Sequence, residues 1–175
     1  IPAIAYAGYP DKRGLDLLCD AWAKVARPGE RLVIGGIDRK RGLQWLDRCA
    51  VPEPAGLEWR GLVPREEWLA LVARSRVFVN ASRREDHGLA QLEALSAGCA
   101  LVTVPSPGPY EALPLARTLG PELVSDDLAA ALRSGLDLED LDSYAAHARE
   151  LLGPFRPGVV ERVVASSLLP ALGIR

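Results

Sequence analysis

The sequence predicts a single α/β domain built on a doubly wound, Rossmann-like parallel sheet. Short and wholly apolar runs recur along the chain, and longer segments with apolar residues at helical spacing separate them. Strands that are apolar on both sides belong to a sheet covered on both faces, and helical crossovers make such strands parallel. The length of 175 residues suits one domain with a real core and is too short for two of ordinary size.

Strands and helices alternate through the first third of the chain, and glycine or proline separates them. The expected elements are a strand at 3–7 closed by Gly8, a helix at 15–25 stopped by Pro28-Gly29, a strand at 32–34 closed by Gly35-Gly36, a helix at 39–50, and a short strand at 57–59 ending at Gly61.

The alternation continues to about residue 104 and then gives way to helix. The expected elements are a helix whose first turn suits Pro64, a strand at 77–79, a helix at 88–97 ended by Gly98, a strand at 100–104, a possible sixth strand at Leu123-Val124, and two tail helices over 144–171 broken at Gly153-Pro154. We therefore expect a core over about 3–135 and a helical tail over about 139–172. The four tryptophans fall within element patterns and are expected in the core.

The composition is that of an ordinary globular protein. Hydrophobic residues make up 49% and charged residues 25%, and the formal net charge of −2 gives no reason to expect nucleic acid or an anionic membrane as partner. Three widely spaced cysteines predict buried, reduced thiols. No transmembrane run or secretory signal is visible, so a cytoplasmic location is expected. The chain opens at Ile1 and contains no Met, from which we infer a fragment, a C-terminal domain.

The stretch from Ser82 to Gly98 carries the strongest chemical pattern. It leaves a strand, crosses a polar loop and enters a helix at Gly88. The first amides of that helix have no partner within it and carry partial positive charge, which makes an anion site suited to a diphosphate. Glu93 lies where a carboxylate can accept hydrogen bonds from ribose hydroxyls, and Glu85 lies in the loop beside whatever the diphosphate bears. Spacing alone leaves the alternative that both glutamates are surface charges.

This stretch resembles the signature of glycosyltransferase family 4, retaining enzymes of the GT-B architecture. There a Ser-x-x-Glu leads into an aromatic-Gly-Leu and then a Glu-Ala-(Leu/Met)-Ala-x-Gly, with seven residues between the glutamates. The residues that match in register are Ser82, Glu85, Gly88, Leu89, Glu93, Ala94, Leu95 and Gly98. The resemblance implies that Glu93 binds the donor ribose, that Glu85 lies beside the donor sugar near the reacting carbon, and that the Gly88-Leu89 amides hold the diphosphate.

The resemblance covers blocks from about Tyr6 to Glu111 in the family's order. It implies that Arg13 and Gly14, in the loop after the first strand, contact the diphosphate, and that the backbone at Val63 receives the base. The residues of this sequence depart from the family at two positions. Tyr9 stands where an Arg is common. His87 stands where an aromatic is usual, and is expected to pack rather than act directly. Lys12 could help Arg13 at the diphosphate, but as an exposed loop charge it is expected to be a bystander.

The family resemblance implies the donor-binding lobe of a retaining, metal-independent hexosyltransferase that uses a UDP- or GDP-type sugar. Its acceptor, a sugar, lipid or small molecule, would bind an N-terminal lobe absent from this chain, so the lobe alone is expected to be inactive. No cofactor, nucleic-acid partner or transmembrane segment is expected, although peripheral membrane contact is possible. No Asp-x-Asp motif or Ser/His/acid triad appears, and His147 is expected to face solvent. Two alternatives stay open: a nucleotide-sugar 2-epimerase, and a non-catalytic nucleotide-binding or interaction lobe.

Overall fold

A computed structural model describes residues 1–173 of the chain. Its five-stranded parallel sheet has the order β3-β2-β1-β4-β5. The strands are β1 (Ala3–Tyr6), β2 (Leu32–Gly35), β3 (Leu57–Gly61), β4 (Val77–Asn80) and β5 (Ala100–Thr103). This arrangement confirms the predicted doubly wound α/β fold, and every predicted strand up to residue 104 is present within one or two residues.

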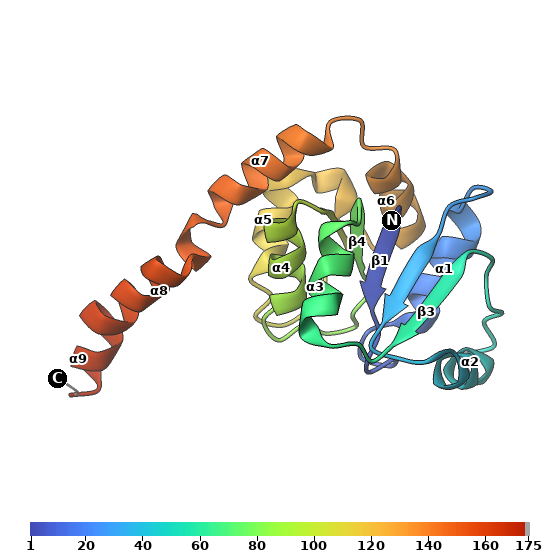
Figure 1. Cartoon of the computed structure of the whole chain (residues 1–175), viewed down its shortest axis with the longest axis horizontal. Coiled ribbons are helices and arrows are strands. Elements are labelled where there is room, and N and C mark those ends of the chain that lie inside the picture. The colour runs from blue at the N-terminus through green and yellow to red at the C-terminus, as the bar shows by residue number, and fades with distance from the viewer. Residues whose placement is uncertain (174–175) are drawn as a thin grey trace.

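Helices cover both faces of the sheet (Figure 1). On one face α1 packs against α6, and on the other α3 packs against α4, which also meets α5 and α7. The helices are α1 (Leu15–Val25), α2 (Arg39–Arg48), α3 (Arg65–Ala73), α4 (Leu89–Ala97), α5 (Ala112–Leu119), α6 (Leu128–Leu136) and α7 (Leu141–Leu151). Because β1, β2, β4 and β5 are buried on both sides, their residues form the centre of the core.

The strand order reverses between β1 and β4. The chain leaves β1 toward β2 on one side and leaves β4 toward β5 on the other. The loops that follow β1 and β4 therefore diverge to opposite faces and leave a crevice between them. Ligands of open α/β sheets bind in such a crevice at the carboxyl ends of the strands, and Arg13 lies on one of these loops while Glu85 lies on the other.

The chain differs from the sequence prediction beyond β5. The possible sixth strand at Leu123-Val124 is wrong, because Pro121–Leu123 forms a 3-10 turn and Val124 makes a single bridge to Thr103. The amides of Leu123 and Val124 donate to the carbonyls of Gly120 and Pro121 within this turn, at 2.9 and 3.2 Å, so neither amide is free to join a strand ladder. The helix predicted over 39–50 ends earlier, at Arg48.

The tail leaves the body of the domain as an arm (Figure 1). A 3-10 turn at Gly153–Phe155 breaks it at the predicted position, and α8 (Pro157–Val163) follows. The second predicted helix is itself interrupted by a π-helical turn, Val164–Leu168, before the short α9 (Leu169–Ala171). No helix within residues 1–173 is both long enough and apolar enough to cross a membrane.

The cysteines and tryptophans follow the prediction in part. All three cysteines are free thiols, and Cys19 and Cys99 are buried whereas Cys49 is half-buried. Burial raises the pKa of Cys19 and of Cys99 to about 12. Trp22 is fully buried, but Trp45 and Trp59 are only half-buried, so the expectation of a core position holds for only part of the set.

Candidate functional site

A cavity of about 490 Å³ opens at the crevice between β1 and β4. Six of the seven residues predicted to form the site line it: Arg13, Val63, Glu85, Gly88, Leu89 and Glu93. The remaining lining residues are Tyr6, Lys12, Arg65, Trp68, Asp86, His87 and Ala90. Residues from four separate segments of the chain thus converge on one cavity, and the family resemblance had named residues from three of these segments.

Glu85 is a buried carboxylate rather than a surface charge. The residue is 3% exposed and accepts three hydrogen bonds. Arg13 Nη1 and Gln91 Nε2 donate to Oε2 at 2.5 and 2.8 Å, and the Asp86 amide donates to Oε1 at 3.2 Å. A buried charge needs such partners, since desolvation without them is costly. The surface-charge alternative is therefore wrong for Glu85.

Arg13 links the two loops that form the crevice. Its Nη1 donates to Glu85 and also to Ser82 Oγ at 3.3 Å, and its guanidinium lies 5.8 Å from the centroid of the Tyr6 ring. The side chain is only 19% exposed. Among residues 1–173, no group accepts a hydrogen bond from its Nη2, so this nitrogen can still donate to an anion in the cavity.

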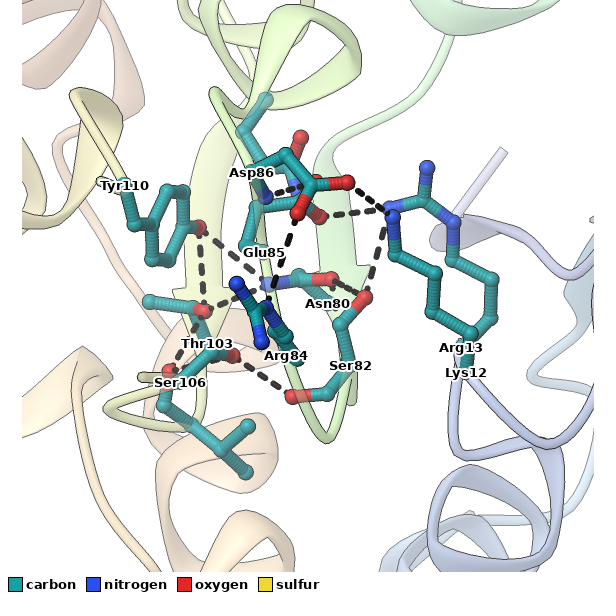
Figure 2. Close-up of polar contacts among 12 residues, drawn as sticks. Lys12, Arg13, Asn80, Ser82, Arg84, Glu85, Asp86, Thr103, Ser106 and Tyr110 are labelled. Carbon is teal, nitrogen blue, oxygen red and sulfur yellow. Dashed lines mark hydrogen bonds and ion pairs between the residues drawn. The ribbon is translucent and has the colours of Figure 1, made fainter. Parts of the chain in front are cut away.

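A buried chain of hydroxyl and amide groups supports Arg13 from below (Figure 2). Ser82 Oγ donates to Asn80 Oδ1 at 2.7 Å, and Asn80 Nδ2 donates to Thr103 Oγ1 and to the Tyr110 hydroxyl at 3.0 and 3.3 Å. Burial raises the pKa of Tyr110 to about 12, so its hydroxyl stays protonated at neutral pH. These groups join the ends of β4 and β5 and fix the height of the loop that carries Glu85.

The N-terminus of α4 faces the cavity. Gly88 caps it in the left-handed conformation, with φ 85°, and no side chain caps the helix. A Cβ at Gly88 would lie 2.7 Å from the Tyr110 ring, so only glycine fits both the φ angle and the space. The first amides of α4 have no partner within the helix, and they lie next to the Gly88 and Leu89 positions that line the cavity.

Glu93 lies one turn further along α4 and is paired with a cation that the sequence analysis missed. Arg65 Nη2, at the start of α3, donates to Glu93 Oε1 at 2.5 Å. The Glu93 side chain is 26% exposed and that of Arg65 is 70% exposed, so the pair sits at the rim of the cavity. The other carboxylate oxygen of Glu93 stays available to a ligand. Only the position of Arg65 directly after Pro64 signals that its side chain starts a helix beside the site.

Two aromatic rings close the side of the cavity nearest β1. Tyr6 and Trp68 meet edge to face, with ring centroids 5.6 Å apart. Trp68 rests on the last residue of β2, Gly35, where a Cβ would lie 2.3 Å from the indole. Trp68 is 9% exposed, so it belongs to the core as predicted, yet it also lines the cavity, which the sequence analysis did not anticipate.

The structure shows where three loop residues named in the sequence analysis lie. His87 was expected to pack, but this is wrong, because the residue is exposed at the cavity rim, and its backbone carbonyl accepts a hydrogen bond from Glu111 N. Lys12, which was expected to be a bystander, lines the cavity and pairs with Asp86 at 2.5 Å, which lowers the pKa of that carboxyl. Gly14 does not line the cavity. A Cβ there would lie 2.1 Å from the Ala81 carbonyl oxygen, so Gly14 lets the two loops approach.

A second cavity of about 570 Å³ lies beside the first, between α4 and the start of the arm. It shares His87, Leu89 and Glu93 with the first cavity but reaches neither Glu85 nor Arg13. Although this cavity is larger, the buried charges and the open end of α4 lie in the smaller one, which we therefore assign as the candidate site.

The doubly wound sheet, with a cavity that Arg13, Glu85 and Glu93 line at its switch point, defines the class of α/β domains that bind a ligand between the β1 and β4 loops. A family model described as "Glycosyl transferases group 1" matches residues 1–138. The chain belongs to this glycosyltransferase family. No curated protein sequence matches it.

Solved structures with the same fold include several glycosyltransferases. WaaG, a glycosyltransferase involved in lipopolysaccharide biosynthesis, aligns with a TM-score of 0.65 and 18% identity over 85% of this chain and 41% of its own. The catalytic domain of cholesterol-α-glucosyltransferase from Helicobacter pylori aligns with a TM-score of 0.58 and 22% identity over 85% of this chain and 98% of its own. A trehalose-phosphate synthase from Burkholderia xenovorans aligns with a TM-score of 0.66 and 18% identity over 88% of this chain and 40% of its own.

These likenesses bear out the predicted GT-B C-terminal lobe. The chain spans about 40% of the length of WaaG and of the synthase. The family model places the chain in the group 1 glycosyltransferase family, and the solved structures show that it has the fold of these enzymes.

Proposed function

We propose that this domain binds the nucleoside-diphosphate sugar of a retaining glycosyltransferase. The observation that carries the proposal is the convergence of Arg13, Glu85, Glu93 and the open N-terminus of α4 on one cavity. A guanidinium and a helix N-terminus together suit a diphosphate, and the two carboxylates on either side suit hydroxyl groups.

The proposed donor lies with its diphosphate against the amides at Gly88 and Leu89. Arg13 reaches the same phosphate oxygens through Nη2 while its Nη1 stays on Glu85. The ribose places its vicinal hydroxyls at the free oxygen of Glu93, and the base extends toward the backbone at Val63. Each contact uses a group that the protein leaves without a full set of partners.

The sugar then lies beside Glu85, and the chemistry follows from the charges. The acceptor hydroxyl attacks the anomeric carbon on the face that the diphosphate leaves, and the leaving phosphate oxygen takes the hydroxyl proton. Arg13 and the α4 amides stabilise the negative charge on the leaving diphosphate, and the Glu85 carboxylate stabilises the positive charge that develops on the sugar. The acceptor and the surface that binds it would come from a preceding lobe.

Titration calorimetry of the chain with UDP, GDP and ADP tests the proposal. At least one should bind saturably, and Glu93→Gln should weaken that binding about 10-fold or more, because a hydrogen bond to a charged group is worth about 1.5–3 kcal/mol. Glu67→Gln, at an exposed acid of α3 away from the cavity, is the matched control. If none of the three nucleotides binds, or if both variants bind equally well, the proposal is wrong.

A second candidate is a non-catalytic nucleotide-binding lobe, and one observation favours it. Tyr9, which replaces the family's usual arginine, is 72% exposed and lies outside the cavity. The chain therefore places fewer cations around the diphosphate than the family pattern implies. Binding of a nucleotide sugar that is never transferred or hydrolysed by the two-lobed protein would favour this candidate.

A further inference from the structure

Gln91 is a buried polar side chain that no motif explained. It lies in the first turn of α4 and is 1% exposed. Its Nε2 donates to Glu85 Oε2 at 2.8 Å, and its Oε1 is fully buried with no hydrogen-bond partner among the described residues. Gln91 does not line the cavity, so it cannot touch a ligand there directly.

The amide has one orientation that the site allows. If its oxygen and nitrogen exchanged places, the oxygen would face the Glu85 carboxylate, and two acceptors would repel one another. The required orientation leaves Oε1 in a dry environment without a donor. An apolar side chain of the same length would avoid this buried, unpaired carbonyl. The amide of Gln91 therefore lowers the stability of the fold. The hydrogen bond from its Nε2 to Glu85 is the interaction that accounts for an amide at this position.

The donors on Glu85 differ in how a ligand would affect them. Arg13 reaches Glu85 from the loop after β1 and lines the cavity, so an incoming diphosphate competes for its guanidinium. Gln91 reaches Glu85 from inside α4 and meets no ligand. The contact from Gln91 therefore persists when the charge on Arg13 is shared with phosphate.

We propose that Gln91 is a positioning residue, which holds the Glu85 carboxylate beside the donor sugar while the guanidinium charge of Arg13 is shared between Glu85 and the diphosphate. The inference rests on the proposed function, and it gives Arg13 and Gln91 different roles within the site. Arg13 responds to the nucleotide part of the donor, and Gln91 secures the group that faces the sugar.

The test separates the sugar from the nucleotide. Calorimetry measures the affinity of the chain for the nucleoside diphosphate that binds best and for the corresponding sugar nucleotides, and the ratio of the two affinities reports the contribution of the sugar. Gln91→Met keeps the length of the side chain and removes the donor. It should leave the affinity for the nucleoside diphosphate within about 2-fold of the wild-type value. It should lower the affinity for the sugar nucleotide that binds best about 10-fold, as expected for loss of a hydrogen bond to a charged group. Gln44→Met, at an exposed residue of α2, is the control and should change neither value.

Gln91→Glu supplies a signature that a merely structural role would not produce. A protonated carboxyl can donate to Glu85, whereas an ionised one cannot and repels it. For this variant, the affinity for the sugar nucleotide divided by that for the nucleoside diphosphate should therefore be below the wild-type value at pH 8 and rise toward it at pH 5. Gln91→Met should show no such recovery.

Four results would overturn the inference. If Gln91→Met lowers both affinities equally, Gln91 acts only through the fold. If it changes neither, Gln91 does not position Glu85. If the wild type binds a nucleotide but gains nothing from any sugar, the proposed function stands in its nucleotide part and the role of Gln91 fails. If no nucleotide binds at all, the proposed function fails first and the inference fails with it.

Discussion

Replacing Gly88 by alanine tests whether the open end of α4 depends on glycine. The left-handed conformation costs a non-glycine residue about 1–2 kcal/mol. At Gly88 the new Cβ would also lie 2.7 Å from the ring of Tyr110, which is buried and hydrogen-bonded. Such overpacking costs about 1–3 kcal/mol. We expect Gly88→Ala to lower the free energy of unfolding by about 2–5 kcal/mol.

Gly29 provides a matched control for this substitution. Its φ of 86° is nearly that of Gly88, at 85°, but a Cβ there meets no atom within 4 Å. Gly29→Ala should cost only the conformational part, about 1–2 kcal/mol. The difference between the two variants isolates the contact with Tyr110.

Urea denaturation followed by circular dichroism measures both variants. With an m-value of about 2 kcal/mol/M, the midpoint should fall by about 1–2.5 M for Gly88→Ala and by about 0.5–1 M for Gly29→Ala. Equal shifts for the two variants would refute the argument, because they would mean that the ring of Tyr110 moves aside at no cost.

Three further predictions concern groups outside the cavity wall. Arg133 lowers the pKa of Glu30 through a hydrogen bond, so Arg133→Met should cost about 1 kcal/mol at pH 7. Because a depressed folded-state pKa stabilises the fold above the unfolded value, this cost should shrink as the pH falls below about 4.5, and a cost that is constant with pH in urea titrations would contradict it. Iodoacetamide should alkylate Cys49 before the two buried cysteines, as peptide mass spectrometry would show, and an equal rate at all three would count against their burial. Tyr110→Phe should lower the free energy of unfolding by about 1–2 kcal/mol, because Asn80 Nδ2 loses one of its acceptors. An unchanged thermal midpoint would show that the Tyr110 hydroxyl does not stabilise the fold.

The order and type of the elements could be predicted because each one has a local signal in the sequence. Apolar runs without polar interruption identify β2, β4 and β5, and Gly35, Gly61 and Gly98 mark where elements end. The prediction of a sixth strand was wrong because Leu123 lies in a 3-10 turn and Val124 makes only a single bridge, to Thr103. Short runs of this kind depend on the neighbouring strand for their pairing, which a single sequence does not report.

The residues of the site could be predicted only where backbone position decides their place. The family resemblance assigned Arg13 and Glu85 to one site, and the strand order fulfils this by placing β1 beside β4, so that the loops after both strands lie at the same edge of the sheet. The contact between Arg65 and Glu93 depends on the direction of two long side chains, and the burial of Gln91 depends on which side of α4 meets the loop. Side-chain directions of this kind follow from packing, so local pattern gave no sign of them.

The ties between the loops after β1 and β4 also determine when the site comes into existence. Arg13 with Glu85, Lys12 with Asp86 and Arg83 with Asp16 join positions 72, 74 and 67 residues apart in the chain. Contacts so distant in sequence form only after the intervening segments have been ordered, and they slow folding for that reason. When only the first half of this domain has emerged from the ribosome, the loop after β1 is present but the loop after β4, which forms the other side of the cavity, is not. The capacity to hold a ligand should arrive abruptly, when β4 docks beside β1.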